Sequence, residues 1–312
     1  MRVVVVGLGV QGYKRRAVAG ADFVASVDPV NSEADFRRLD DVPIESYEAV
    51  LACIPDAPKI ELLNTCVANK KHVLVEKPLA ADREEDISAL EARARRAGVV
   101  CYTAYNHRFE PHYMRMRELL ATGDLGAIYS CRMFYGNGTA RLVRDSAWRD
   151  RGAGVLPDLG SHLLDTCRFW FGDIADDFFI VSARAFENRS PDHVVIASEG
   201  GRLRIELEMT LLMWRNHFTC DILAEKGSAH IQSLCKWGPA TFTHRRRVFP
   251  SGRPPEESVT LIQEDPTWAM EYAHFKELCR NATPTNLAND IWLSRALKRI
   301  GGDAIKIAEK AA

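Results

Sequence analysis

This chain of 312 residues lacks three features, and each absence argues against a class of protein. It has no apolar run near the ~20 residues needed to span a bilayer. Its net charge of −1 leaves no surplus of positive charge for nucleic acid. Its eight cysteines form no Cys-x-x-Cys pair, and no paired spacing of metal ligands occurs. We therefore expect no membrane partner, no nucleic-acid partner and no metal site.

The cysteines and the N-terminal residues also bear on location. The basic cluster at residues 14–16 follows the first apolar run, whereas a signal peptide carries its positive charge before the apolar stretch. Scattered cysteines without a secretory signal are typical of free thiols in a reducing cytosol. The sequence therefore predicts a cytoplasmic protein.

The first strand and turn are the most informative stretch. Four valines at residues 3–6 form an apolar run without alternation, which predicts a strand buried on both faces. Gly7, Gly9 and Gly12 follow with the spacing G-x-G-x-x-G. The first glycine permits a tight turn, the second lets a pyrophosphate approach the backbone, and the third lets a helix pack on the strand. The N-terminus of a helix over 11–19 would then face the phosphates.

The second strand, over residues 23–27, ends in Asp28. An acid at this place accepts hydrogen bonds from the ribose hydroxyls of adenosine and repels a 2′-phosphate. The expected cofactor is therefore NAD, with NADP as the alternative. A glycine-rich turn without any ligand is the competing interpretation, and the flanking strand and helix argue against it.

Strands and helices then alternate up to about residue 105. Apolar runs predict strands over 50–54, 72–76 and 99–103, with helices over 58–69 and 82–97 between them. The polar segment after Asp28 predicts a helix over 31–39 and a short strand over 42–44. This alternation predicts a parallel sheet with right-handed crossovers. Since parallel strands end at one edge, we expect these residues to gather there: Gly7, Asp28, Ile54, Pro55, Glu76, Lys77, Asn106 and His107.

The pattern changes after about residue 120. Extended segments predict strands over 128–135, 178–185, 193–198, 203–212 and 218–224, with a hairpin turn at Gly200–Gly201. Helices are predicted over 156–171, 268–280 and 291–310. This half reads as a mostly antiparallel sheet covered on one face by helices. The basic run 244–247 is interpreted as a solvated hairpin or loop, with phosphate binding as the alternative.

Lys77 is the first candidate for chemistry. It follows a strand and precedes Pro78, which restricts the local backbone. A lysine beside a substrate hydroxyl could stabilise a developing alkoxide or move a proton. An ordinary surface turn is the alternative for Lys77 taken alone.

A second candidate is the stretch RGAGVLPDLGSHLLD at residues 151–165. Asp158 and His162 are four residues apart, which puts both on one helical face, and Asp165 lies three residues further on. A carboxylate beside an imidazole can act as an acid–base pair. A surface ion pair, or an aspartate that satisfies the helix dipole, explains this stretch equally well. Upstream, Trp148 and Arg149 could supply a stacking wall and a cation for a polar substrate, although a structural tryptophan is equally consistent.

Together these features resemble the glucose–fructose oxidoreductase / inositol dehydrogenase / MocA (Gfo/Idh/MocA) family of pyridine-nucleotide sugar oxidoreductases. The resemblance rests on six stretches: GLGVQG at 7–12, VDP at 27–29, IP at 54–55, KKHVLVEKPLA at 70–80, YNHRFEP at 105–111 and WRDRGAGVLPDLGSHLLD at 148–165. It implies an α/β protein with an N-terminal Rossmann domain, a doubly wound parallel sheet, and a C-terminal α/β domain with an open, mostly antiparallel sheet. We divide the chain into a dinucleotide-binding domain at 1–119 and a substrate-binding and oligomerisation domain at 120–312. The resemblance also implies a homodimer or homotetramer that pairs through the exposed sheet face.

The resemblance further implies roles for individual residues. His162 would be the general acid/base, while Lys77 and Asp158 would hold and polarise the substrate hydroxyl or carbonyl. The cofactor would contact Gly7, Gly9, Val10, Gln11, Gly12, Asp28, Ile54, Pro55, Glu76 and Lys77. The substrate would contact Asn106, Arg108, Trp148 and Arg149. Two departures stand out: residues 29–49 are short for this fold, and Lys59 replaces a histidine that is frequent in the family.

The expected function is transfer of a hydride between NAD(P) and a secondary alcohol or carbonyl of a sugar, sugar nucleotide or cyclitol. Two alternatives remain open. One is a non-catalytic sensor or regulator that binds a dinucleotide with the same fold. The other is a reductase of the same fold that acts on imines or dihydrodiols. Intact Lys77, Asp158 and His162 favour an enzyme over a sensor.

Overall fold

The computed structural model describes residues 1–146, 149–198 and 200–311. Its contacts divide the chain into two compact units. The first unit comprises residues 1–106 and 266–295, and the second comprises residues 107–265 and the chain from residue 296 onward. These units differ from the division expected at residue 119 in two places. Helix α4 (Pro111–Thr122) packs on α6 (Ser161–Phe171) of the second unit, and α7 (Thr267–Arg280) packs in the first.

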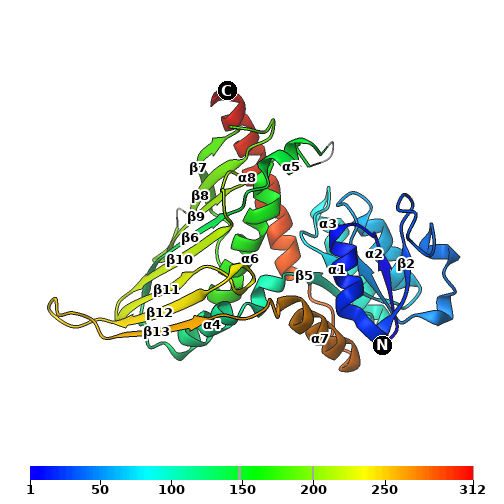
Figure 1. The fold of residues 1–312 in the computed structure, drawn as a ribbon, viewed down its shortest axis with the longest axis horizontal. Coiled ribbons are helices and arrows are strands. Elements are labelled where there is room, and N and C mark those ends of the chain that lie inside the picture. The colour runs from blue at the N-terminus through cyan, green and yellow to red at the C-terminus, as the bar shows by residue number, and fades with distance from the viewer. Residues whose placement is uncertain (147–148, 199, 312) are drawn as a thin grey trace. The chain divides into compact units, whose positions relative to one another are not determined.

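The first unit is built on a parallel five-stranded sheet, which confirms the predicted Rossmann architecture (Figure 1). Its strand order is β2-β1-β3-β4-β5. The strands are β1 (Val3–Val6), β2 (Phe23–Val27), β3 (Ala49–Ala52), β4 (His72–Glu76) and β5 (Cys101–Ala104). The continuous apolar runs of β1 and β3 are buried throughout, as expected for strands covered on both faces.

Helices cover both faces of this sheet, so the fold is doubly wound. On one face, α1 (Val10–Ala19) and α7 pack against Val3, Val5 and Leu51. On the other, α2 (Lys59–Ala68) and α3 (Glu84–Ala97) pack against Val4 and Val50. The alternation of strands and helices in the sequence therefore predicted this unit correctly.

The segment between β2 and β3 differs from the prediction. The helix expected over 31–39 and the strand expected over 42–44 are both wrong: this described segment holds only the short turns η2 (Leu39–Asp41) and η3 (Ile44–Ser46) and a bridge from Phe36 to Val27. The Asp28 carboxylate accepts the N–H groups of Val30 and Asn31, and such local side-chain bonds compete with a helix for the backbone.

The second unit contains an eight-stranded sheet in the order β13-β12-β11-β10-β6-β9-β8-β7. Between the described strands, β6 and β9 form the one parallel pair, and the other pairs are antiparallel, as predicted. The strands are β6 (Ile128–Gly136), β7 (Phe178–Arg184), β8 (His193–Ser198), β9 (Arg204–Thr210), β10 (His217–Ala224), β11 (Gly227–Gln232), β12 (Ala240–Arg246) and β13 (Glu256–Leu261).

One face of this sheet is covered by helices, including α4, α6 and the later part of α8 (Ala288–Ala311) (Figure 1). Tyr113 of α4, for example, contacts Phe218 of β10 and Trp170 of α6. The opposite face carries cross-strand ion pairs such as Arg132 with Glu206 at 3.1 Å. The basic run 244–247 lies largely in the hairpin of β12 and β13, where Arg245 and Arg246 pair with Glu256 and Glu257. Across the described ranges, no helix combines the length and the apolar character needed to cross a membrane.

Candidate active site

The turn between β1 and α1 needs the glycines that the motif supplies. Gly7 has φ +90°, and a Cβ there would lie 2.3 Å from the carbonyl oxygen of Cys53. A Cβ on Gly12 would lie 2.0 Å from the carbonyl oxygen of Gly7. Gly9 is different, since a Cβ there would meet nothing within 4 Å. Two of the glycines are therefore required by packing, whereas the third keeps space open.

That open space lies at the N-terminus of α1. Gly9 is the N-cap residue of this helix, and no side chain forms a capping hydrogen bond there. The first turn of α1, all of whose residues are described, contains no acidic residue. The N–H groups at Val10 and Gln11 are therefore not capped by protein side chains, and Val10 is 75% exposed. Helix N-termini of this kind bind phosphate groups. This turn fits the pyrophosphate of a dinucleotide.

Asp28 stands at the carboxyl end of the neighbouring strand β2. Its Oδ2 accepts the N–H of Leu8 at 2.8 Å, and its Oδ1 accepts the N–H groups of Val30 and Asn31 at 2.9 and 2.8 Å. Burial opposes ionisation, but these hydrogen bonds outweigh it and lower the pKa of Asp28. The carboxylate is therefore ionised at neutral pH and fixed in orientation beside the glycine turn.

A buried arginine holds the segment at the end of β4. Arg15 of α1 is 1% exposed; its Nε donates to Glu76 Oε1 and its Nη2 to Glu271 Oε2, both at 2.7 Å. The guanidinium also lies over the ring of Trp268, 4.3 Å from its centroid. Glu76 is thus anchored immediately before Lys77.

A buried lysine holds the other side of Lys77. Lys59 is 1% exposed, and its Nζ donates to Asp56 Oδ1 at 2.6 Å and to the carbonyl oxygen of Pro78 at 2.8 Å. Burial lowers the pKa of Lys59, and Asp56 opposes that shift. The residue that departs from the family pattern therefore ties the segment after β3, with Ile54 and Pro55, to the segment after β4.

In the second unit, the stretch predicted as one helix begins with a π-helical turn, η5 (Leu156–Gly160), which runs directly into α6. Asp158 lies in this turn and His162 is the second residue of α6. Asp158 Oδ2 lies 3.5 Å from Nη2 of Arg149. Trp148, predicted beside Arg149, lies outside the described residues.

His162 is one of two stacked histidines. It is 9% exposed, and its ring lies over that of His107 with centroids 4.0 Å apart and planes at 19°. His107 is 3% exposed, and its Nε2 lies 3.2 Å from Nζ of Lys236. Sequence reasoning did not find Lys236, because it stands in the short turn η6 (Cys235–Trp237) within no recognisable motif.

A buried carboxylate fixes the turn that carries Lys236. Glu110, 1% exposed, accepts the N–H of Cys235 at 3.0 Å and contacts its Sγ at 2.9 Å. Burial raises the pKa of Glu110, and burial together with Glu110 raises the pKa of the Cys235 thiol. The Lys236 turn is therefore attached to the start of α4, next to His107.

Two predicted substrate residues are engaged with the protein. The amide of Asn106 donates to Thr267 Oγ1 at 2.8 Å within the first unit. Arg108 binds Asp165 through two hydrogen bonds of 2.9 and 2.5 Å within the second unit. Asp165 therefore pairs with Arg108, and the contacts of Asn106 and Arg108 with a substrate stay a prediction.

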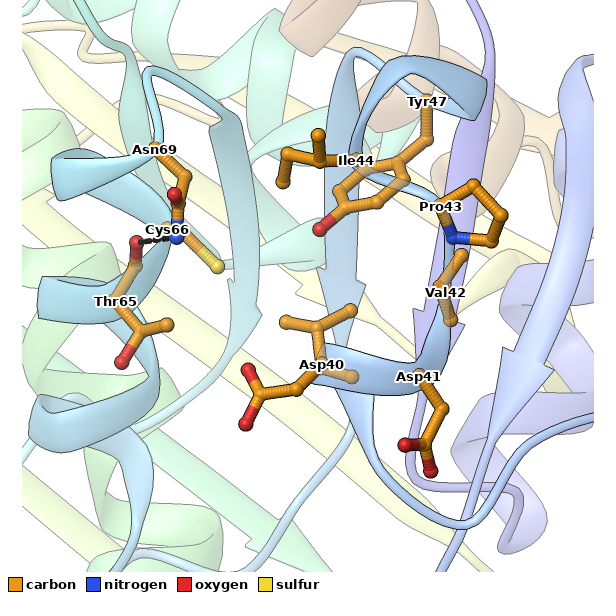
Figure 2. Close-up of a pocket in the computed structure, with 10 residues that line it drawn as sticks. Asp40, Asp41, Val42, Pro43, Ile44, Tyr47, Thr65, Cys66 and Asn69 are labelled. Atoms are coloured by element: carbon orange, nitrogen blue, oxygen red, sulfur yellow. Dashed lines mark hydrogen bonds between the residues drawn. The ribbon is translucent and has the colours of Figure 1, made fainter.

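A cavity of about 420 Å³ in the first unit lies away from these groups (Figure 2). Thr65 and Cys66 line it from the end of α2, Asn69 from the residue after that helix, and Tyr47 from just before β3. It is therefore at the edge where the strands begin, opposite to the glycine turn and Lys77. The remaining lining residues are Leu39, Asp40, Asp41, Val42, Pro43 and Ile44. Burial raises the pKa of Tyr47 to about 12.

The predicted site residues thus fall into two groups. The glycine turn, Asp28, Ile54, Glu76 and Lys77 lie at or just beyond the carboxyl ends of parallel strands in the first unit. Asp158, His162 and Arg149 belong to the second unit. All eight cysteines are free thiols, and the described parts of the chain contain no group of three side chains suited to a metal ion.

Two family models match the chain. A model described as an oxidoreductase family with an NAD-binding Rossmann fold matches residues 1–105, which places the protein among dinucleotide-binding oxidoreductases. The model of the GFO/IDH/MocA C-terminal domain matches residues 113–230. The chain belongs to the Gfo/Idh/MocA family, and its first unit is the NAD-binding Rossmann domain.

Several curated relatives of this chain are named as dehydrogenases. Glucose-6-phosphate 3-dehydrogenase of Bacillus subtilis is 29% identical over 158 residues, which cover 49% of this chain and 44% of that protein. Inositol 2-dehydrogenase 2 of Mycolicibacterium vanbaalenii is 27% identical over 259 residues, covering 74% of this chain and 72% of that protein. The matched part of the chain spans less than half the length of several of these relatives.

Solved structures share the fold. Levoglucosan dehydrogenase in complex with NADH and L-sorbose superposes with a TM-score of 0.82 at 16% identity, covering 97% of both chains. GenD2 from gentamicin A biosynthesis, in complex with NAD, gives a TM-score of 0.73 at 20% identity, covering 100% of this chain and 94% of that one. These likenesses confirm the predicted two-part architecture.

Proposed function

We propose that this protein transfers a hydride between NAD and a secondary alcohol or carbonyl of a sugar, sugar nucleotide or cyclitol. The observation that carries the proposal is the β1–α1 turn, where open space at Gly9 faces uncapped N–H groups beside the ionised Asp28. Relatives named as glucose-6-phosphate and inositol dehydrogenases support the substrate class.

The cofactor would be held by the predicted set of residues. The backbone at Gly9, Val10 and Gln11 would bind the pyrophosphate, and Asp28 would accept the ribose hydroxyls of adenosine. A fixed negative charge at Asp28 supports NAD over NADP, since it repels a 2′-phosphate. Glu76 and Lys77 would border the nicotinamide ribose. When bound, the nicotinamide ring supplies the hydride acceptor or donor.

The catalytic set would combine Lys77, Asp158 and His162. His162 would take the proton of the substrate hydroxyl during oxidation and return it during reduction. Lys77 would donate a hydrogen bond to the same oxygen, and Asp158, which pairs with Arg149, would orient the substrate. The proposal assigns further substrate contacts to Asn106, Arg108, Trp148 and Arg149.

Location and assembly are part of the same proposal. Eight free thiols support the reducing cytoplasm. The sheet face opposite the helices of the second unit would join copies of the chain into a homodimer or homotetramer. Light scattering during gel filtration tests this assembly directly, and a single species with the mass of one chain would contradict it.

The test is a panel of sugars, cyclitols and nucleotide sugars, each offered with NAD and with NADP, followed by the absorbance of the reduced nicotinamide. With the best substrate, His162→Ala and Lys77→Ala should each lower kcat by about 10²- to 10⁴-fold while NADH still binds. His217→Ala, which changes an exposed histidine of β10, is the matched control and should retain activity.

Three outcomes would change the proposal. Turnover close to that of the unmodified protein in both His162→Ala and Lys77→Ala would remove the catalytic assignment. Binding of NADH without turnover of any compound would favour a sensor. Turnover of imines or dihydrodiols alone would favour the reductase alternative.

A further inference from the structure

Three side chains of the second unit contact one another in sequence, and the last of them is the proposed acid/base, His162. Lys236 Nζ lies 3.2 Å from Nε2 of His107, and the ring of His107 stacks on that of His162 at 4.0 Å. The three come from different elements: η6, the turn η4 (Asn106–Phe109) and α6. His107 and His162 are both at least nine-tenths buried, so bulk water has little access to either ring.

The chemistry of the lysine decides where the proton of His107 lies. A lysine ammonium has three hydrogen-bond donors and no acceptor. Facing an ammonium, Nε2 of His107 would accept the hydrogen bond and carry no proton. His107 is then neutral, with its single ring proton on Nδ1.

We propose that Lys236 is a positioning residue that keeps His107 neutral, so that His162 is the one ring of the stacked pair that exchanges a proton with the substrate. This inference rests on the proposed function of His162. The reason is electrostatic: two imidazoles in face-to-face contact compete for one proton, because a positive charge on one opposes a positive charge on the other. Because Nε2 of His107 accepts a hydrogen bond from the ammonium of Lys236, His107 does not compete with His162 for this proton.

Nearby carboxylates and an aromatic ring stabilise the charged form of Lys236, while burial works against it. Burial lowers the pKa of Lys236, but the carboxylates of Asp265, Glu110 and Asp158 oppose this shift. Its Nζ also lies 4.8 Å from the centroid of the Trp237 ring, and an aromatic face stabilises a cation. Among the described residues, the titratable or charged groups near Lys236 and His107 include Glu110 and Tyr113 of the α4 region, Tyr135 of β6, Asp158 with Arg149, His162, Cys235 and Asp265.

The first test reads the proton directly. Ring ¹⁵N chemical shifts of the full-length protein, with His107→Gln used to assign the signals, should show His107 protonated on Nδ1 and not titrating between pH 6 and 8. In Lys236→Met the same ring should titrate, and in Lys236→Arg it should not, because arginine keeps a charged donor. An Nε2-protonated or titrating His107 in the unmodified protein would overturn the proposal.

The second test reads catalysis. For substrate oxidation, the acidic limb of the kcat/KM profile should move upward by about half a pH unit or more in Lys236→Met, since loss of the ammonium lets the stacked pair bind a proton more easily. Lys236→Arg should retain the original limb, and Lys226→Met, which changes an exposed lysine of the same unit, should leave it in place. Equal limbs in Lys236→Met and the unmodified protein would contradict the proposal.

The two tests separate this inference from the proposed function. The NMR measurement needs neither substrate nor cofactor, so it stands even if no compound in the panel is turned over. Should Lys236→Met fail to fold, the tautomer of His107 in the unmodified protein and in Lys236→Arg still decides the question.

Discussion

The two units hold their polar groups in different ways. Around Glu76 and Lys77, the first unit uses two buried cations: Arg15, paired with two carboxylates, and Lys59, paired with one. Around His162, the second unit uses a stack of two imidazoles with one lysine behind it. Arginine stays charged at every physiological pH, whereas imidazole changes charge near neutrality. The first arrangement therefore suits a fixed frame, and the second suits proton exchange.

The largest effect on stability should come from breaking the frame at Arg15. Arg15→Met removes the cation that pairs with both Glu76 and Glu271, and Glu271 is fully buried. Loss of one partner from a buried ion pair costs about 3–5 kcal/mol. Urea unfolding of Arg15→Met should show a loss of this size.

Arg16→Met is the matched control for Arg15→Met, because Arg16 is the next residue of α1 and is exposed. It should cost less than about 1 kcal/mol. Equal losses of unfolding free energy in the two variants would show that the buried ion pairs of Arg15 add no stability. Arg15 would then not act as a fixed frame that differs from the histidine stack.

A smaller effect on stability should distinguish Gly12, which is required by packing, from Gly9, which faces the proposed cofactor site. In Gly12→Ala the new Cβ meets the carbonyl oxygen of Gly7, so overpacking should cost about 1–3 kcal/mol of unfolding free energy. In Gly9→Ala the methyl group enters open space, and the cost should stay within about 1 kcal/mol.

The affinity for NADH should be reduced in Gly9→Ala, although this variant loses less stability than Gly12→Ala. In Gly9→Ala the added methyl group occupies the place expected for the pyrophosphate, so the Kd for NADH should rise about tenfold, which corresponds to about 1.4 kcal/mol. Fluorescence titration with NADH measures it. Unchanged affinity in Gly9→Ala would show that the cofactor does not approach this glycine.

The smallest effect concerns the pH dependence of stability at Lys59. Its folded-state pKa lies below that of the unfolded chain, so between the two values the unfolded chain binds more protons and stability rises with pH. Relative to Lys59→Met, the unmodified protein should therefore gain stability as the pH rises toward 10.5, the ordinary pKa of a lysine.

Parallel unfolding series from neutral to alkaline pH measure this difference for Lys59→Met. Lys70→Met, which changes an exposed lysine, should show no such trend against the unmodified protein. A difference that is constant with pH would mean that Lys59 is as easily charged inside the protein as outside it.

The sequence was sufficient for features that repeat or follow a known spacing. The apolar runs of β1, β3 and β4 marked a parallel sheet because strands covered on both faces need no polar side. The glycine turn could be read because its spacing has a steric cause, which Gly7 and Gly12 confirm.

Single buried charges could not be found in this way. Arg15 stands between two exposed basic residues, Lys14 and Arg16. It differs from them only in lying on the face of α1 that points into the protein. Lys236 and His107 are 129 residues apart, and no periodicity links them. The prediction for residues 29–48 was wrong for a related reason. The backbone there is set by hydrogen bonds to the side chains of Asp28 and Asn31, and such bonds leave no repeating pattern in the sequence.

The first unit is discontinuous along the chain, and this has a consequence for biosynthesis. Tyr272 and Phe275 of α7 cover the face of the parallel sheet formed by Val3, Val5 and Leu51, yet they are encoded after the entire eight-stranded sheet. A ribosome therefore releases the sheet-forming residues long before their cover exists. The nascent N-terminal region must wait with an apolar surface uncovered, and premature termination before residue 266 would leave that surface permanently exposed to chaperones and proteases.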